Sequence, residues 1–379
     1  MTGVAAATPR AATLDEPPRR LRAVRAAFLL PAGLALLAGL DAALMLLGVP
    51  APIRADRLPE VHGMLLVFGF LTTLISLERA VALRRRAGFA APALTGFGGL
   101  LLLSPAPLPI GKATLLAGTV ALVAVYVPLW RRQRDAAVLV QAFGAILAAG
   151  ALVLWLGEVT MPALVPWLAG FVVLTIGGER LELARLSMGP GADAALVLLA
   201  GGVSIGVVAA LLWPDVGSPL FGLALLGLTG WLAAHDVARR TIRSRGLPRF
   251  AAGCMLAAYF WLAVAAAVWL VGGVAGDGAA YDGVLHAVFL GFALSMVLAH
   301  APVILPAVLR RPLPYHAAMI APAVLLHASL VLRLWVGDAL GHRWAWQAGG
   351  VGNIAAILLF AGLAAWLVGT GARSTWARR

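Results

Sequence analysis

Twelve long apolar segments constrain the fold of this chain more than any other feature of its sequence. Each approaches or exceeds the roughly 20 residues that a helix needs to cross a hydrocarbon layer. The chain is 62% hydrophobic and only 12% charged, whereas a soluble domain carries about 25% charged residues. The segments cover residues 26–48, 60–83, 90–108, 112–130, 136–156, 162–184, 193–213, 219–238, 249–274, 281–309, 314–336 and 346–369. The sequence therefore predicts an all-α, polytopic membrane protein with about twelve transmembrane helices.

A single membrane domain accounts for nearly the whole chain. Residues 25–370 are expected to form one transmembrane domain, because no hydrophilic stretch within them is long enough for a soluble domain. Residues 1–24, rich in proline and arginine, predict a disordered basic tail, and residues 371–379 predict a second basic tail. The first apolar segment has no convincing cleavage site, so no signal peptide is expected. The single cysteine, Cys254, excludes a disulfide and a thiolate metal cluster.

The formal net charge of +13 is distributed in a way that predicts topology rather than nucleic-acid binding. Most arginines lie in alternate loops or at the chain ends, at residues 10–25, 79–86, 131–134, 180–185, 239–249, 310–311 and 373–379. The intervening loops hold mostly acids, namely Asp56, Glu158, Asp215, Asp277, Asp282 and Asp338. Since positive loops stay in the cytoplasm, both termini are predicted to be cytoplasmic. Abundant alanine, glycine and arginine with little lysine favour a bacterial inner membrane, with the lipid bilayer as partner and no nucleic acid.

A short motif recurs in the second, sixth and tenth apolar segments. It combines a Gly-Phe dipeptide with ionisable residues at a fixed spacing: Gly69-Phe70 with Glu78-Arg79, Gly170-Phe171 with Glu179-Arg180, and Gly291-Phe292 with His300. Each interval between copies contains four segments. The recurrence indicates three four-helix repeats with ionisable groups at one depth, where they are costly and usually functional.

Two histidines open the second and tenth segments at matched depth. His62 and His286 both lie within roughly 10 Å of the outer helix ends, at 1.5 Å of rise per residue. Two neutral imidazoles on facing helices are what a bis-histidine heme b requires. The alternative is that each histidine sits at the membrane interface and bonds a neighbouring loop.

His300 and His327 form a second candidate pair, deeper in the membrane. His300 lies four helical turns after His286 and so is expected on the same face. His327, on the eleventh segment, differs from it in depth by only about 6 Å. Imidazoles bind copper as well as heme iron. The alternative is that each bonds a backbone carbonyl freed by Pro302 or Pro322.

The remaining charged candidates are Glu78, Arg79, Glu179 and Arg180 near the cytoplasmic ends and Asp41 and Arg333 near the outer ends. The first group predicts ion pairs between helices that hold the repeats together, with a proton path from the cytoplasm as the alternative. Two alternatives are expected for Asp41 and Arg333. Either the two side chains pair with each other, or Arg333 holds a heme propionate.

The run Val61-His-Gly-Met-Leu-Leu-Val-Phe-Gly-Phe-Leu resembles the heme-ligand segment on the second helix of heme–copper oxidase subunit I. Three further stretches resemble the NnrS family, namely Arg25-Ala-Ala-Phe-Leu-Leu-Pro-Ala-Gly, Ile176-Gly-Gly-Glu-Arg, and residues 286–314. The NnrS family comprises twelve-helix bacterial membrane proteins associated with heme, copper and nitric-oxide stress. The resemblance runs over residues 20–370 and implies His62 and His286 as heme ligands, and His300 and His327 as metal ligands.

The sequence also departs from both families. The oxidases have a His-x-His pair on the tenth helix and copper histidines on the sixth and seventh, whereas this chain spaces His286 and His300 by fourteen and has no histidine on those other two helices. Glu179 is inserted where NnrS-like proteins usually show Gly-Gly-Arg followed by proline. The departures argue against a standard oxygen-reducing centre.

These observations lead to one functional hypothesis and two alternatives. We expect an NnrS-like heme protein of the inner membrane, with heme b and a weaker expectation of copper, that serves nitric-oxide or metal stress or respiratory redox chemistry. Its ligand would be nitric oxide or another small diatomic molecule. The alternatives are a proton-coupled transporter of a small solute and a cofactor-free assembly partner of a respiratory complex. The sequence assigns no reaction.

Overall fold

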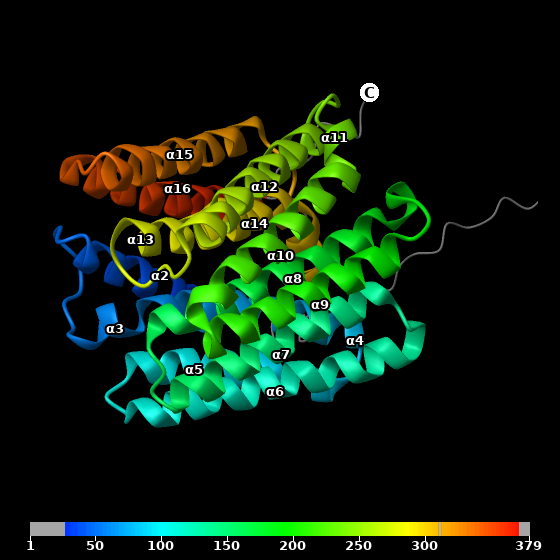
Figure 1. The fold of residues 1–379 in the computed structure, drawn as a ribbon, viewed down its shortest axis with the longest axis horizontal. Helices are drawn as coiled ribbons and strands as arrows, with labels where there is room; N and C mark the ends of the chain where they lie inside the picture. Colours follow the sequence, from blue (N-terminus) through cyan, green and yellow to red (C-terminus); the bar gives the residue numbers. More distant parts are fainter. Residues whose placement is uncertain (1–26, 310, 312, 371–379) are drawn as a thin grey trace, which may run out of the picture.

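Apolar helices make up this protein, as the sequence predicts. The computed structural model describes residues 27–309, 311 and 313–370, so both predicted basic tails fall outside the described residues. Within them every regular element is a helix (Figure 1). The helices are α2 (Leu29–Leu46), α3 (Arg57–Met64), η1 (Leu65–Thr72), α4 (Thr73–Leu83), η2 (Arg86–Phe89), α5 (Ala90–Leu103), α6 (Leu108–Gln133), α7 (Ala136–Leu156), α8 (Met161–Met188), α9 (Ala192–Leu212), α10 (Pro214–His235), α11 (Ala238–Thr241), α12 (Leu247–Gly272), α13 (Gly278–His286), η3 (Ala287–Leu294), α14 (Ser295–Leu309), η4 (Ala317–Met319), α15 (Ile320–Val331), η5 (Leu332–Ala339) and α16 (Arg343–Thr370).

The described residues form 12 helical segments that are long and apolar enough to cross a membrane, which confirms the predicted fold class. Residues at the helix ends explain where two of these helices begin. Pro107 precedes α6 and a second proline occupies its first turn, where a missing N–H costs nothing. The Asp135 carboxylate accepts a hydrogen bond from the Ala137 N–H and so caps the start of α7.

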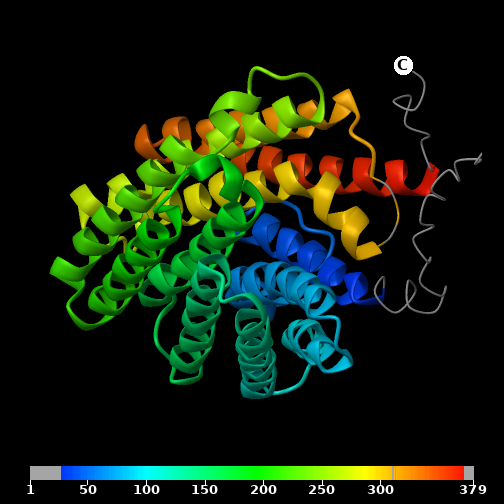
Figure 2. The ribbon, with the colours of Figure 1, turned by 90° about the vertical axis from the view of Figure 1, so that its right-hand side faces the viewer.

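The second, sixth and tenth segments form the centre of the bundle. The shares of their apolar windows buried inside the protein are 61%, 78% and 67%, against 33–56% for the other nine described segments. Figure 2 shows the chain as three sectors around this centre, from blue and cyan through green to yellow and red. The three motif-bearing segments are therefore the ones that protein, rather than lipid, surrounds, as expected for costly polar groups.

π-helical turns interrupt the second, tenth and eleventh segments, as η1, η3 and η5. In η1 the Thr72 hydroxyl donates to the Val67 carbonyl, five residues back, at 2.8 Å. π-turns are rare and appear mostly at functional sites. His62 lies in the last turn before η1, and His286 is the last residue before η3. Both candidate heme ligands therefore lie within one turn of the start of a π-helical segment.

The glycine of each repeated motif lies where another helix comes close. A Cβ on Gly69 would lie 2.8 Å from Ala35 Cβ, and one on Gly170 would lie 2.8 Å from Leu147 Cδ1. A Cβ on Gly291 would collide with Cβ and Cγ of Trp261 on α12. Small residues at these positions permit the helices to approach.

We expect Gly291→Ala to destabilise the protein by about 1–3 kcal/mol, because η3 and α12 must separate to admit the methyl group. Thermal unfolding of the purified protein in detergent measures the effect. Gly230→Ala is the matched control, since Gly230 also lies within a helix and nothing is within 4 Å of its added Cβ. Equal unfolding temperatures for the two variants would contradict the close packing at Gly291.

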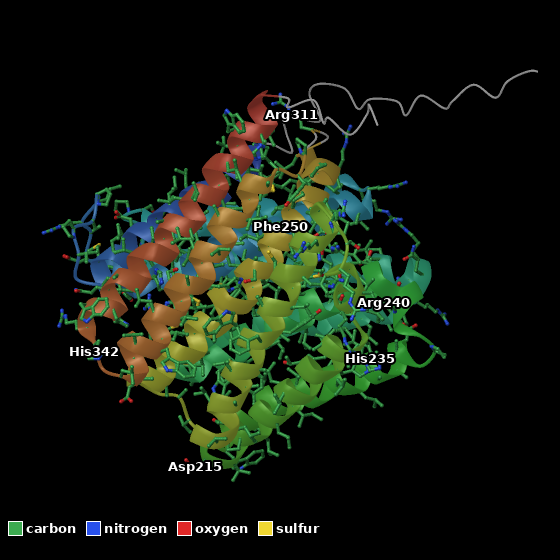
Figure 3. The ribbon with its side chains drawn as sticks, turned by 90° about the horizontal axis from the view of Figure 1, so that it is seen from above. Asp215, His235, Arg240, Phe250, Arg311 and His342 are labelled. Atoms are coloured by element: carbon green, nitrogen blue, oxygen red, sulfur yellow. The ribbon has the colours of Figure 1, made fainter. Side chains whose placement is uncertain are left out.

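The two ends of the bundle differ in their charged residues. Figure 3 shows Arg240 and Arg311 at one end and Asp215 and His342 at the other. We call the first the arginine-rich end; it carries Arg84–Arg86, Arg131, Arg132 and Arg134 at the ends of α4 and α6. The cytoplasmic location of this end stays a prediction from the charge pattern.

Candidate functional site

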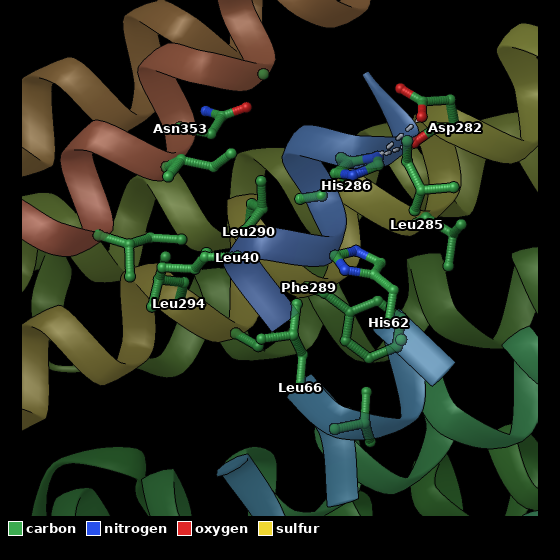
Figure 4. Close-up of a pocket in the computed structure, with 18 of the residues that line it drawn as sticks. Leu40, His62, Leu66, Asp282, Leu285, His286, Phe289, Leu290, Leu294 and Asn353 are labelled. Atoms are coloured by element: carbon green, nitrogen blue, oxygen red, sulfur yellow. Dashed lines mark hydrogen bonds and ion pairs between the residues drawn. The ribbon is translucent and has the colours of Figure 1, made fainter. Parts of the chain in front are cut away.

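A cavity of about 430 Å³ opens between the helices at the end opposite the arginine-rich end. This volume lies within the range of roughly 300–1,000 Å³ that small ligands and cofactors occupy. Its walls come from α2, α3 with η1, α8, α13 with η3, η5 and α16. Most lining side chains are apolar, among them Leu40, Leu66, Phe289, Leu290 and Leu294 (Figure 4). The few polar groups are therefore the ones that would orient a ligand.

Both candidate heme ligands line this cavity (Figure 4). His62 Nδ1 is 2.8 Å from the Gly39 carbonyl oxygen of α2. His286 Nδ1 is 2.9 Å from the Asp282 carbonyl oxygen, one turn earlier on α13. A carbonyl only accepts, so in each neutral ring Nδ1 carries the proton and Nε2 carries the lone pair. Neither Nε2 has a hydrogen-bond partner among the described residues.

Arg333 and Asp282 fix the position of His286. Arg333 donates to both carboxylate oxygens of Asp282, from Nε at 2.8 Å and from Nη2 at 2.7 Å. Asp282 Oδ1 is 3.3 Å from His286 Nδ1, so the same carboxylate supports the ring nitrogen that carries the proton. The Arg333 guanidinium also lies over the Trp346 ring, 5.3 Å from its centroid. Its Nη1 makes no hydrogen bond with a described residue and remains available at the cavity wall.

One of the two predictions for Arg333 is wrong. Asp41 does not pair with it: Asp41 Oδ1 accepts a hydrogen bond from the Ile53 N–H, at 3.3 Å. The partner is Asp282, which sequence reasoning treated only as a loop acid. The available signal was its position one turn before His286, since residues four apart on a helix are neighbours.

The structure does not bring His300 and His327 together as ligands of one metal ion. His300 Nε2 is 2.8 Å from Arg180 Nη1, and its Nδ1 is 2.7 Å from the Met296 carbonyl oxygen, so both ring nitrogens are engaged. His327 Nδ1 accepts from Trp261 Nε1 at 3.1 Å. The described residues also contain no group of three or more His, Cys, Asp or Glu side chains that could hold a metal ion. Copper at this pair stays a prediction without structural support.

His286 and His300 meet different parts of α8. His286 lines the cavity together with Met161, Val165 and Leu168 of α8, and His300 contacts Arg180 farther along the same helix. The predicted shared face of the two histidines stays a prediction.

Arg79 and Arg180 make ion pairs between segments at the arginine-rich end as predicted, but their partners are Glu182 and Asp236, and neither Glu78 nor Glu179 makes such a pair with a described residue. Arg79 of α4 contacts Glu78 and also donates to Glu182 of α8 at 3.0 Å. Arg180 of α8 donates to both oxygens of Asp236, which follows α10, at 2.8 and 2.9 Å. The second, sixth and tenth segments are thus tied together by Arg79–Glu182 and Arg180–His300.

Asp236 lies just outside the spanning helices and is 2% exposed. Burial alone would raise the pKa of its carboxyl group, but the hydrogen bonds and charge of Arg180 outweigh burial and hold that pKa below its usual value. Tyr259 Oη donates to the same carboxylate at 2.6 Å. This carboxylate therefore stays ionised under ordinary conditions and balances the buried Arg180.

Comparison with known proteins gives the family. No curated protein and no solved structure matches the chain. One family model matches residues 25–369, which is nearly the whole described domain. The chain therefore belongs to the family described as "Domain of unknown function (DUF8744)".

Proposed function

We propose that this protein binds one heme b in the cavity, with His62 and His286 as the axial ligands. One observation carries the proposal: two imidazoles from different segments face one apolar cavity, and each has its Nδ1 held by a carbonyl and its Nε2 unpaired. Metal-bound histidines usually have this arrangement, because the second hydrogen bond fixes the tautomer and the ring plane. The resemblance to NnrS-like proteins favours the same assignment.

The other lining groups fit this cofactor. A porphyrin is a large apolar plane with two carboxylates at one edge. Leu40, Leu66 and Phe289 offer apolar walls, and Arg333, which also lines the cavity, offers Nη1 for a propionate. Asp282 would keep His286 oriented while Arg333 holds Asp282. The two Nε2 lone pairs, the apolar walls and the Arg333 guanidinium are therefore the groups that heme b requires of its binding site.

The proposed role follows from the ligand set. A heme held by two imidazoles supplies a one-electron redox centre. Redox chemistry in a bacterial inner membrane, in response to nitric oxide or metal stress, is the function we propose. The protein contributes two fixed imidazoles, an apolar shell that excludes water, and a cation for the propionates.

Visible absorption of the purified protein tests the proposal. The full chain is made in a heme-supplemented host, purified in detergent, and its spectrum recorded oxidised and dithionite-reduced, with heme quantified as the pyridine adduct. We expect one heme b per chain and a sharp α-band after reduction. A spectrum without heme bands from such a host would contradict the proposal and favour the alternative function, transport of a small solute.

A further inference from the structure

A second polar region lies at the arginine-rich end, apart from the cavity. Three carboxylates gather there around one guanidinium: Glu78, Glu179 and Glu182 around Arg79. Arg79 is 6% exposed and makes ion pairs with Glu78 and Glu182. Glu179 makes no hydrogen bond or ion pair with any described residue. Arg180 is next to Glu179 and acts on it as well, but it is paired with Asp236. Arg79 alone does not balance three carboxylates, so the region has excess negative charge in a poorly screened setting.

A buried tyrosine lies within electrostatic range of this region. Tyr126 of α6 is 2% exposed, and its Oη has no hydrogen-bond partner among the described residues. The phenol lies close enough to Arg79, Glu78, Glu179 and Glu182 to interact electrostatically with all four. A buried hydroxyl without a partner is destabilising, and ordered water usually supplies the missing partner.

Two further hydroxyls of the central helices are also without partners. Ser76 Oγ, one turn before Arg79, and Thr175 Oγ1, one turn before Glu179, are buried and make no hydrogen bond with a described residue. Elsewhere in the bundle such hydroxyls bond the carbonyl one turn earlier, as Thr119, Ser204 and Thr229 do. Serine and threonine in helices normally have this local option. Ser76 and Thr175 do not use it, which leaves them free for water.

We propose that Glu179 and the hydroxyls of Tyr126, Ser76 and Thr175 form a hydrated proton-binding site at the arginine-rich end of α4 and α8. Waters join the three hydroxyls to Glu179, and Glu179 accepts a proton from the solution at that end and returns it, without any other bond forming or breaking. Glu78 and Glu182 differ from Glu179 in that each makes an ion pair with Arg79. The proposal does not depend on heme in the cavity.

Infrared difference spectroscopy of the full chain in lipid nanodiscs tests this site. The sample is titrated from mildly acidic to mildly alkaline pH, and the carbonyl stretch of a protonated carboxylic acid is followed in H₂O and D₂O. We expect one titrating, D₂O-sensitive band that Glu179→Gln abolishes. Glu182→Gln is the matched control and should retain the band, because Glu182 is half-exposed and paired with Arg79.

Tyr126→Phe keeps the proposal testable if Glu179→Gln does not fold. It removes one oxygen and preserves the packing of the ring, and we expect it to shift the frequency of the carboxylic acid band by removing a link in the water network. An unshifted band in Tyr126→Phe, or a band that persists in Glu179→Gln, would overturn the proposal. Absence of any titrating band in the wild-type protein would do the same.

Discussion

Replacing His62 or His286 with alanine is expected to abolish the low-spin heme spectrum. Among the described residues that line the cavity, the second and tenth segments contribute one imidazole each, so neither loss can be compensated locally. Changing a group that merely supports a metal ligand costs roughly 10–100-fold in metal affinity, and losing a ligand should cost at least about tenfold. The measurement is heme content and the reduced α-band after purification.

His342→Ala serves as the control for both variants. His342 lies at the same end of the bundle, is exposed, and lies outside the cavity (Figure 3). We expect it to retain full heme content. If His62→Ala and His286→Ala keep an unchanged spectrum as well, any heme present is bound elsewhere and the assignment of these ligands is wrong.

Breaking the Arg180–Asp236 pair is expected to cost about 3–5 kcal/mol of stability, because it strands an uncompensated buried charge. Arg180 is 4% exposed and Asp236 2% exposed, so water cannot replace the lost partner. Asp236→Asn also weakens the hydrogen bond from Tyr259. Thermal unfolding in detergent, followed by tryptophan fluorescence, should show a large drop for Asp236→Asn.

Two comparisons separate this effect from a general loss of charge. Arg239→Ala removes an exposed charge three residues away, and we expect its unfolding temperature to stay near that of the wild type. The double variant Arg180→Met with Asp236→Leu should recover part of the stability, because replacing a whole buried pair is often neutral. A double variant less stable than Asp236→Asn would argue against an uncompensated charge as the cause.

The same pair predicts the direction of a pH effect. The pKa of Asp236 is lowered in the folded protein, so its stabilisation is fully present above the unfolded pKa of about 3.9. It is lost as the pH falls through the lower, folded value. We therefore expect the stability difference between wild type and Asp236→Asn to be constant near neutrality and to shrink in acid.

Segment positions could be predicted closely because the membrane imposes a simple rule. A segment must be apolar over a fixed length, and polar residues or prolines mark its ends. The expected segment 136–156 coincides with α7, and 60–83 differs from the observed span Arg57–Leu83 by three residues at one end. The central position of the second, sixth and tenth segments was not predicted and came from their burial in the structure.

Side-chain partners could not be predicted in the same way. Depth along a helix follows from sequence, because the rise per residue is constant, but rotation about the axis does not. The equal depths of His300 and His327 suggested a shared metal, yet their rings contact Arg180 and Trp261. The π-helical segments η1, η3 and η5 were not predicted either, because the residue pattern does not distinguish them from α-helix.

Hydropathy and counting along the chain were enough to predict the class of protein, the twelve apolar segments and the matched positions of His62 and His286 near the helix ends. Packing of the helices was needed to show that both rings line one cavity, that Asp282 supports His286, and that Tyr126 lies within electrostatic range of the carboxylates of α4 and α8. The cause is that each helix must match the bilayer separately by its apolar length. The rotation of a helix about its axis and the contacts of its side chains depend instead on how the helices pack against one another.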